Sequence, residues 1–246
     1  MRHSVQARAG DPIYVGTSGW AYASWKPDFY PPKTPAKKML AYYGTQLNSV
    51  EVNYTFRQLP TPKMLAAWLA DVPESFRFSF KAPQRMTHYR RLKECGEDLA
   101  ALDSALQPVL ASDQFGVLLM QLPPNFRIDL ERMEAFLADA RRSELRVAFE
   151  FRDVSWFTDE TYALLTAHQT ALCVAESDEL VTPRIRTAPF TCYRLRKSTY
   201  SEADLEERGR WLTEDAQRGQ VFAYFKHEET PDGALSARQL LGRLRT

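Results

Sequence analysis

The chain has 246 residues, of which 44% are hydrophobic and 26% are charged, so it contains enough apolar material for a sizeable buried core. Its formal net charge of +1 excludes a global electrostatic field that would draw it to nucleic acid or to a membrane surface. Cys95, Cys173 and Cys192 have neither metal-ligand spacing nor the pattern of a disulfide framework, which predicts a reducing, cytoplasmic location. No stretch approaches the roughly 20 apolar residues of a transmembrane helix, so we expect no membrane contact.

Eight short apolar runs recur along the chain, each rich in Val, Phe, Tyr or Leu and short enough to form a buried strand. The runs are Ile13–Thr17, Ser49–Asn53, Phe76–Ala82, Phe115–Leu122, Leu145–Phe151, Ala171–Ala175, Phe190–Leu195 and Val221–Lys226.

Helical patterns lie between most of these runs. Thr61 followed by Pro62 is typical of a helix start, and Leu99, Leu102, Leu106 and Leu110 recur at helical spacing. Further helices are expected after the possible caps Asp129, Thr158 and Ser201, and over the leucines from Leu235 to Leu244.

The alternation of strands and helices predicts an α/β fold, a single (β/α)8 TIM-type barrel with parallel strands. An open doubly wound sheet is less favoured, because no glycine-rich dinucleotide or phosphate-binding motif follows any of the runs. We assign residues 12–246 to the barrel and residues 1–11 to an N-terminal tail.

In such a barrel, the reactive residues gather where the strands end at the C-terminal face. Cations outnumber carboxylates there, which predicts a cationic pocket with aromatic walls that suits a phosphate or carboxylate ligand. The polar and aromatic residues predicted at this mouth are Trp20, Glu51, Asn53, Lys81, His88, Gln121, Glu150, Arg152, Glu176, Arg194, Arg196 and Lys226.

Among these residues, Glu51 or Glu150 is the predicted general base, and His88 or Lys81 the acid or electrostatic stabiliser. Substrate binding is assigned to Trp20, Asn53, Gln121, Arg152, Arg194, Arg196 and Lys226, and to Trp156 through the family resemblance described next. A competing interpretation makes both glutamates structural ion pairs with Lys81, Arg152 or Arg194. A divalent metal held by Glu51, Glu150 and Glu176 is a further alternative, but the cations compete for these carboxylates, and we expect no metal or other cofactor.

Five blocks of sequence resemble the YecE-like family, domain of unknown function 72: GTSGWAYASWKPDFYP, VEVNYTF, FRFSFKA, LLMQLPPNF and AFEFRDVSW. The resemblance implies a TIM-type barrel and implies no settled activity. By block matching it places the family's pocket on ten of the residues above, namely Trp20, Glu51, Asn53, Lys81, His88, Gln121, Glu150, Arg152, Trp156 and Arg194. The chain departs from the family pattern after VEVNYTF, where Arg57 and Gln58 stand, and at the ends of the last three strands. The ends of the seventh and eighth strands shift toward positive charge, with Arg196, Lys197 and Lys226.

We therefore expect an enzyme of hydrolase or lyase type that acts on an anionic, phosphorylated substrate. The alternative is a non-catalytic protein that binds nucleic acid or nucleotides through its cationic rim. A carbohydrate enzyme is a third, weaker interpretation. The sequence indicates no obligate protein partner.

Overall fold

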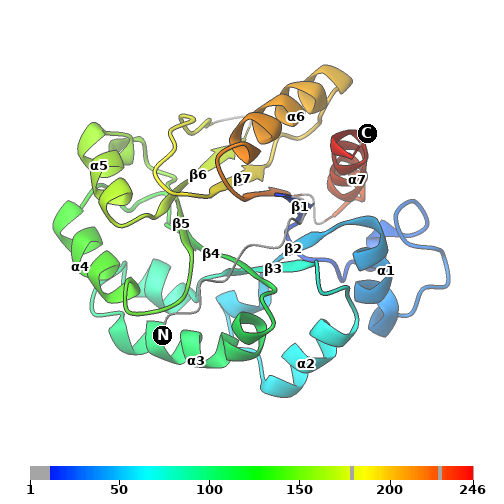
Figure 1. Ribbon diagram of the computed structural model, residues 1–246, viewed down its shortest axis with the longest axis horizontal. Helices are drawn as coiled ribbons and strands as arrows, with labels where there is room; N and C mark the ends of the chain where they lie inside the picture. The colour runs from blue at the N-terminus through cyan, green and yellow to red at the C-terminus, as the bar shows by residue number, and fades with distance from the viewer. Residues whose placement is uncertain (1–11, 178–179, 227–228, 246) are drawn as a thin grey trace.

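The computed structural model describes residues 12–177, 180–226 and 229–245, and Figure 1 shows the strands at the centre of the molecule with helices around them. All strand pairs are parallel, in the order β1-β8-β7-β6-β5-β4-β3-β2. The strands are β1 (Ile13–Thr17), β2 (Ser49–Val52), β3 (Arg77–Lys81), β4 (Phe115–Gln121), β5 (Val147–Glu150), β6 (Ala171–Glu176), β7 (Thr191–Leu195) and β8 (Val221–Phe225). The (β/α)8 barrel is confirmed. Seven predicted runs contain their strands, and β6 extends one residue beyond its run, to Glu176. The predicted tail, residues 1–11, lies outside the described residues.

Helices follow most strands, as the sequence predicts. They are α1 (Met39–Gln46), α2 (Pro62–Ala70), α3 (Gly96–Ala111), α4 (Leu130–Ala140), α5 (Asp159–Ala167), α6 (Glu202–Ala216) and α7 (Asp232–Leu244). The predicted caps are confirmed, since the side chains of Thr61, Asp129, Thr158 and Ser201 each accept a hydrogen bond from a backbone N–H in the first turn. Among the described helices, none combines the length and the apolar character needed to cross a membrane.

Two connections differ from the expected pattern. Helix α1 has no side-chain cap, so the usual start signal was missing from the sequence. Between β6 and β7, the described residues 180–190 form no helix. The outer faces of these two strands are therefore covered by an extended segment and by the neighbouring α6.

Side chains inside the barrel form a buried cluster of their own, separate from the larger core between the sheet and the helices. Tyr224 of β8 lies at its centre, and its hydroxyl is 2.7 Å from Ser49 Oγ of β2 and 2.6 Å from Ser79 Oγ of β3. This hydroxyl group therefore connects three strands across the interior.

Strands β1 and β2 are joined mainly by side chains rather than by a regular backbone ladder. The side chain of Asn48 accepts from Val15 N at 2.8 Å and donates to Ile13 O at 2.8 Å. The Tyr43 hydroxyl accepts from Thr17 N at 2.8 Å and donates to Ser49 O at 2.9 Å. These two side chains satisfy the edge of β1, and we call this region the β1–β2 seam.

We expect Asn48→Ala to lower the free energy of unfolding by about 1–3 kcal/mol, because it removes the hydrogen bonds of Asn48 to the Val15 N–H and to the Ile13 carbonyl at the β1 edge. Urea unfolding measures the change. The control is Gln58→Ala, which removes an exposed amide and should change stability by less than about 0.5 kcal/mol. Equal stability of the two variants would show that water replaces the Asn48 bonds without loss.

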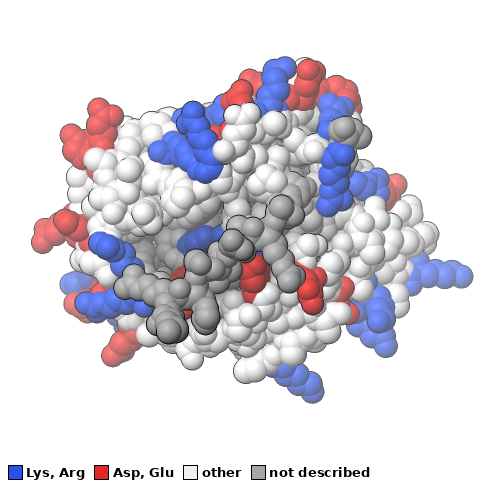
Figure 2. Space-filling view, viewed as in Figure 1, with Lys and Arg blue, Asp and Glu red and all other residues white. Residues whose placement is uncertain are grey.

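Charges of both signs are distributed over the molecular face drawn in Figure 2, where basic and acidic side chains are interspersed. Among the described residues visible in this view, no continuous region of one sign appears. This distribution agrees with the net charge of +1.

Candidate functional site

Arg194, near the end of β7, is the centre of the polar site inside the barrel, where its side chain is only 2% exposed. Its Nε and Nη2 donate to the two oxygens of Glu51 at 2.9 and 2.8 Å, a bidentate arrangement. Its Nη1 donates to Glu150 Oε2 at 2.5 Å. One guanidinium group thus connects β2, β5 and β7.

The remaining contacts occupy every oxygen of the two carboxylates. Glu51 Oε1 also accepts from Ser18 Oγ at 2.8 Å. Glu150 Oε1 accepts from Gln121 Nε2 at 3.0 Å and pairs with Arg196 Nη2 at 2.7 Å. The geometry therefore favours the ion-pair interpretation of the glutamates over the general-base interpretation, since every carboxylate oxygen already contacts an arginine or an amide, which makes it a weaker base.

The same contacts keep these buried groups charged. Burial alone would raise the pKa of Glu150, but the charges of Arg194 and Arg196 outweigh burial and lower it. Burial would lower the pKa of Arg194, but Glu150 and Glu51 raise it well above its ordinary value. The network is a set of mutually neutralising charges at neutral pH.

Lys81, the last residue of β3, is the exception in this network. Its Nζ lies 4.2 Å from the centroid of the Phe56 ring, and among the described residues its ammonium group makes no hydrogen bond or ion pair. Burial, followed by the charge of Arg194, lowers the pKa of Lys81 to about 8, although Glu51 and Glu150 act in the opposite direction. Lys81 therefore changes its protonation state close to neutral pH.

His88 lies next to this group, in the turn Arg85–Tyr89 that follows β3. Its ring packs edge-to-face against Phe56 at a centroid distance of 5.2 Å, and its Nδ1 is 2.9 Å from Thr87 Oγ1. Burial and the charges of Lys81 and Arg152 lower its pKa. Phe56 was not among the predicted site residues, although it ends the VEVNYTF block, and it is the surface that Lys81 and His88 share.

Four other predicted residues take less central positions. Arg152 and Lys226 are exposed just beyond β5 and β8, and Asn53 is half-buried just beyond β2. Trp20 is half-buried and packs edge-on against Trp68 at 5.3 Å. These positions agree with a rim around the polar site.

Trp156 is a correction. Its side chain is fully buried, its Nε1 donates to Phe126 O at 2.7 Å, and its ring stacks on Phe151 at 4.7 Å. The short turn Val154–Trp156 directs the indole into the core beneath the loop, so the predicted contact with substrate is wrong for this structure.

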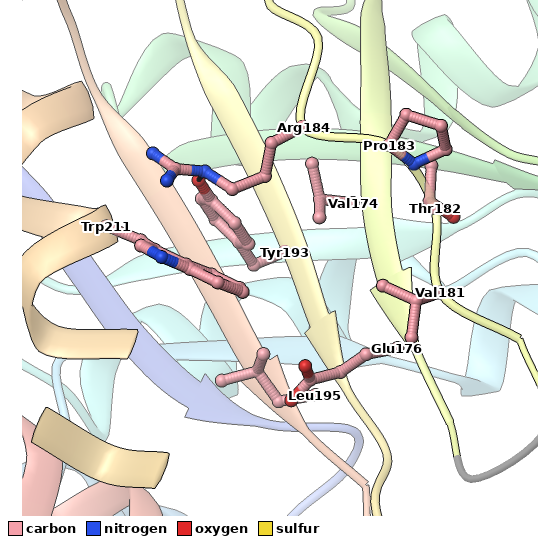
Figure 3. Close-up of a pocket in the computed structure, with 9 residues that line it drawn as sticks. All are labelled: Val174, Glu176, Val181, Thr182, Pro183, Arg184, Tyr193, Leu195 and Trp211. Carbon is pink, nitrogen blue, oxygen red and sulfur yellow. Dashed lines mark hydrogen bonds between the residues drawn. The ribbon is translucent and has the colours of Figure 1, made fainter. Parts of the chain in front are cut away.

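Glu176 is a second correction, because it faces the outside of the barrel. Arg208 of α6 binds it at 2.8 Å, and the Tyr200 hydroxyl donates to it at 2.7 Å. Figure 3 shows Glu176 beside Leu195 and Val181, and these residues, with Val174 and Tyr193, help to line a cavity of about 270 Å³ against the helix-free connection. The alternative metal set of Glu51, Glu150 and Glu176 is therefore not assembled, and the described residues contain no group of three or more His, Cys, Asp or Glu placed for a metal ion.

Known proteins similar to this chain include two curated bacterial relatives. UPF0759 protein YunF of Bacillus subtilis is 31% identical over 156 residues, which cover 61% of this chain and 54% of the relative. UPF0759 protein YecE of Escherichia coli K12 is 27% identical over 146 residues, which cover 59% of this chain and 50% of the relative. The aligned part thus spans about half the length of these relatives.

Solved structures of similar architecture cover nearly the whole chain. A DUF72 family protein of Thermotoga maritima, TM1631, has a TM-score of 0.85 at 25% identity and covers 95% of this chain and 99% of its own. One of Enterococcus faecalis, EF0366, has a TM-score of 0.80 at 18% identity, with coverage of 95% and 96%, and it supports the fold alone. The family model described as "Protein of unknown function DUF72" matches residues 14–246, and the chain therefore belongs to the DUF72 family.

Proposed function

We propose that this protein is an enzyme that acts on a small anionic, phosphorylated substrate at the C-terminal mouth of the barrel. The observation that carries the proposal is the ammonium group of Lys81 beside His88, which forms no hydrogen bond or ion pair with the described residues, in a site where both carboxylates are already neutralised. Lys81 and His88 transfer protons, Arg152, Arg196 and Lys226 bind the anion, and Glu51 and Glu150 hold Arg194 in place. This arrangement replaces the predicted role of the glutamates as the base.

The charges of the site support an anionic ligand. Arg194 and Arg196 match the two buried carboxylates, so the charge of Lys81 is in excess. Arg152 has no acidic partner among the described residues, and the buried Nε of Arg196 has no hydrogen-bond partner there. A phosphate oxygen near Arg196 would accept a hydrogen bond from this Nε–H. Leaving such a buried N–H without an acceptor costs about 1–3 kcal/mol.

The protonation states support acid–base chemistry. Because the pKa of His88 is lowered below its ordinary value of 6.5, its imidazole is mainly neutral at pH 7 and able to accept a proton. Lys81, with a pKa of about 8, is mainly protonated at pH 7 and able to donate one. Two adjacent groups that titrate on either side of neutrality form the acid and base pair that such catalysis needs.

Thermal unfolding with inorganic phosphate, pyrophosphate and glycerol 3-phosphate tests the proposal. At least one of these anions is expected to raise Tm, and Arg152→Ala is expected to weaken its affinity about tenfold, as for the loss of one charge-assisted hydrogen bond. Arg210→Ala, which removes an exposed arginine of α6 distant in sequence from the strand ends, is the matched control and should leave affinity unchanged. If none of the anions raises Tm, or if both variants behave alike, the anion site is not where we place it.

The nucleic-acid alternative predicts a different result in the same experiment. Short oligothymidylate would then raise Tm more than phosphate does, and the effect would disappear as salt increases. The interspersed charges in Figure 2 favour a small ligand, because a nucleic acid strand requires a continuous basic track.

A further inference from the structure

We propose that Lys81 is a nucleophile that forms a Schiff base with an aldehyde or ketone group of the anionic substrate. The inference rests on the proposed function, because bound phosphate would hold the carbonyl at the mouth of the barrel. It narrows that function to carbonyl compounds that carry a negatively charged group, and to lyase chemistry rather than hydrolysis.

The first argument is that half-buried Lys81 forms no ion pair with the described residues, although two buried carboxylates lie near it. A lysine near buried carboxylates normally pairs with one of them. Here Arg194 occupies both oxygens of Glu51 and one of Glu150, and Arg196 and Gln121 occupy the other oxygen of Glu150. The two carboxylates near Lys81 are thus committed to arginines, and its amine is left for a ligand.

The second argument is the balance of effects on the Lys81 amine, which lowers its pKa. Burial and the charges of Arg194 and Lys226 disfavour the ammonium form, and together they outweigh Glu51 and Glu150, which favour it. The face of the Phe56 ring, 4.2 Å from Nζ, also favours the ammonium form. With a pKa of about 8, roughly a quarter of the Lys81 side chains are neutral at pH 7.5, against about one in a thousand for an ordinary lysine. Only the neutral amine attacks a carbonyl.

The covalent step balances without an oxidant or a reductant. The neutral amine nitrogen attacks the carbonyl carbon, a C–N bond forms, and the π electrons of the carbonyl move to its oxygen, which takes up a proton from solvent. Loss of water from this carbinolamine then gives the iminium ion. His88, whose ring packs on the same Phe56 and whose pKa responds to the charge of Lys81, is placed to take the proton from nitrogen and return it to the departing hydroxyl.

Reductive trapping tests the inference on the full chain. The protein is incubated at pH 7.5 with pyruvate, glyoxylate or dihydroxyacetone phosphate in the presence of cyanoborohydride, which reduces an imine to a stable secondary amine. Peptide mass spectrometry is expected to find the adduct on Lys81 at least tenfold faster than on the exposed lysines Lys63 and Lys93. Since all three lysines are compared within one wild-type sample, the result does not depend on how a variant folds.

Lys81→Arg supplies the second measurement, because it keeps the positive charge and removes the nucleophile. It should form no adduct at position 81. Labelling of Lys81 no faster than of Lys63 and Lys93 would overturn the Schiff base. If Lys81 is not labelled selectively but phosphate binding still depends on Arg152, only the Schiff base is wrong. If phosphate binding also does not depend on Arg152, the proposed function is wrong as well.

Discussion

Arg194→Met is expected to lower the free energy of unfolding by about 3–5 kcal/mol, the cost of removing one partner from a buried ion pair. Glu51 would keep only the Ser18 hydroxyl, and Glu150 would keep Arg196 and Gln121. Methionine fills a similar volume, so most of the loss comes from uncompensated negative charge. Urea unfolding at pH 7 measures it.

The pH dependence distinguishes this cause from simple loss of packing. In the wild type, the folded pKa of Glu150 is lowered, so its contribution to stability is present above its unfolded pKa and is lost as pH falls through the folded value. In the variant, a buried carboxylate without its cation takes up a proton more readily in the folded state. The deficit of Arg194→Met should therefore shrink between pH 7 and pH 5.

Arg210→Met is the matched control, because it removes an exposed arginine from a surface pair with Glu206 and should cost no more than about 1 kcal/mol. A deficit that stays constant with pH would assign the loss to packing. Equal stability of the two variants would mean that the network at the mouth contributes nothing to folding.

Gly16→Ala is the second large effect that we expect, with a loss of about 3 kcal/mol or more, at or above the upper end for overpacking. A Cβ atom at this position would lie 1.9 Å from the carbonyl oxygen of Ser49 and 3.0 Å from the Tyr43 hydroxyl. The obstacle is backbone, which no rotamer change can move, so β1 and β2 must separate. Thermal and urea unfolding measure the loss.

Gly242→Ala is the control for the same chemical change. It lies exposed in α7, where an added Cβ meets nothing within 4 Å, and alanine should stabilise the helix by about 0.5–1 kcal/mol. Opposite signs for the two variants would confirm the tight approach at the β1–β2 seam. A stable Gly16→Ala protein would show that the seam yields easily.

Much of the fold follows from the sequence because its strands are buried on both faces and appear as continuous apolar runs. The same property makes it impossible to tell from the sequence which side chains of a strand point into the barrel and which point outward. β6 is apolar on both faces, so nothing in its pattern tells that Glu176 points outward. Helix α1 was not predicted because it has no capping side chain and contains Gly44.

The location of the candidate site could be predicted from the sequence, but most of its side-chain contacts could not. Arg194 and Arg196 were expected on one face of their strand, and both bind Glu150. Side-chain geometry across the barrel decides which of several cations reaches a carboxylate. The sequence therefore could not predict that Lys81 stays outside the ion pairs. It also could not predict the turn that buries Trp156.

Strand β1 pairs along its whole length with β8, whereas toward β2 it relies mainly on side chains. This arrangement has a consequence during synthesis. The segment IYVGT leaves the ribosome early, but its principal backbone partner is translated only after seven strands have been made. Until then it is an unpaired apolar edge, the kind of segment that promotes aggregation. The nascent chain therefore needs protection at its first strand until nearly all of the barrel has been translated, and interrupted translation before β8 leaves that strand exposed.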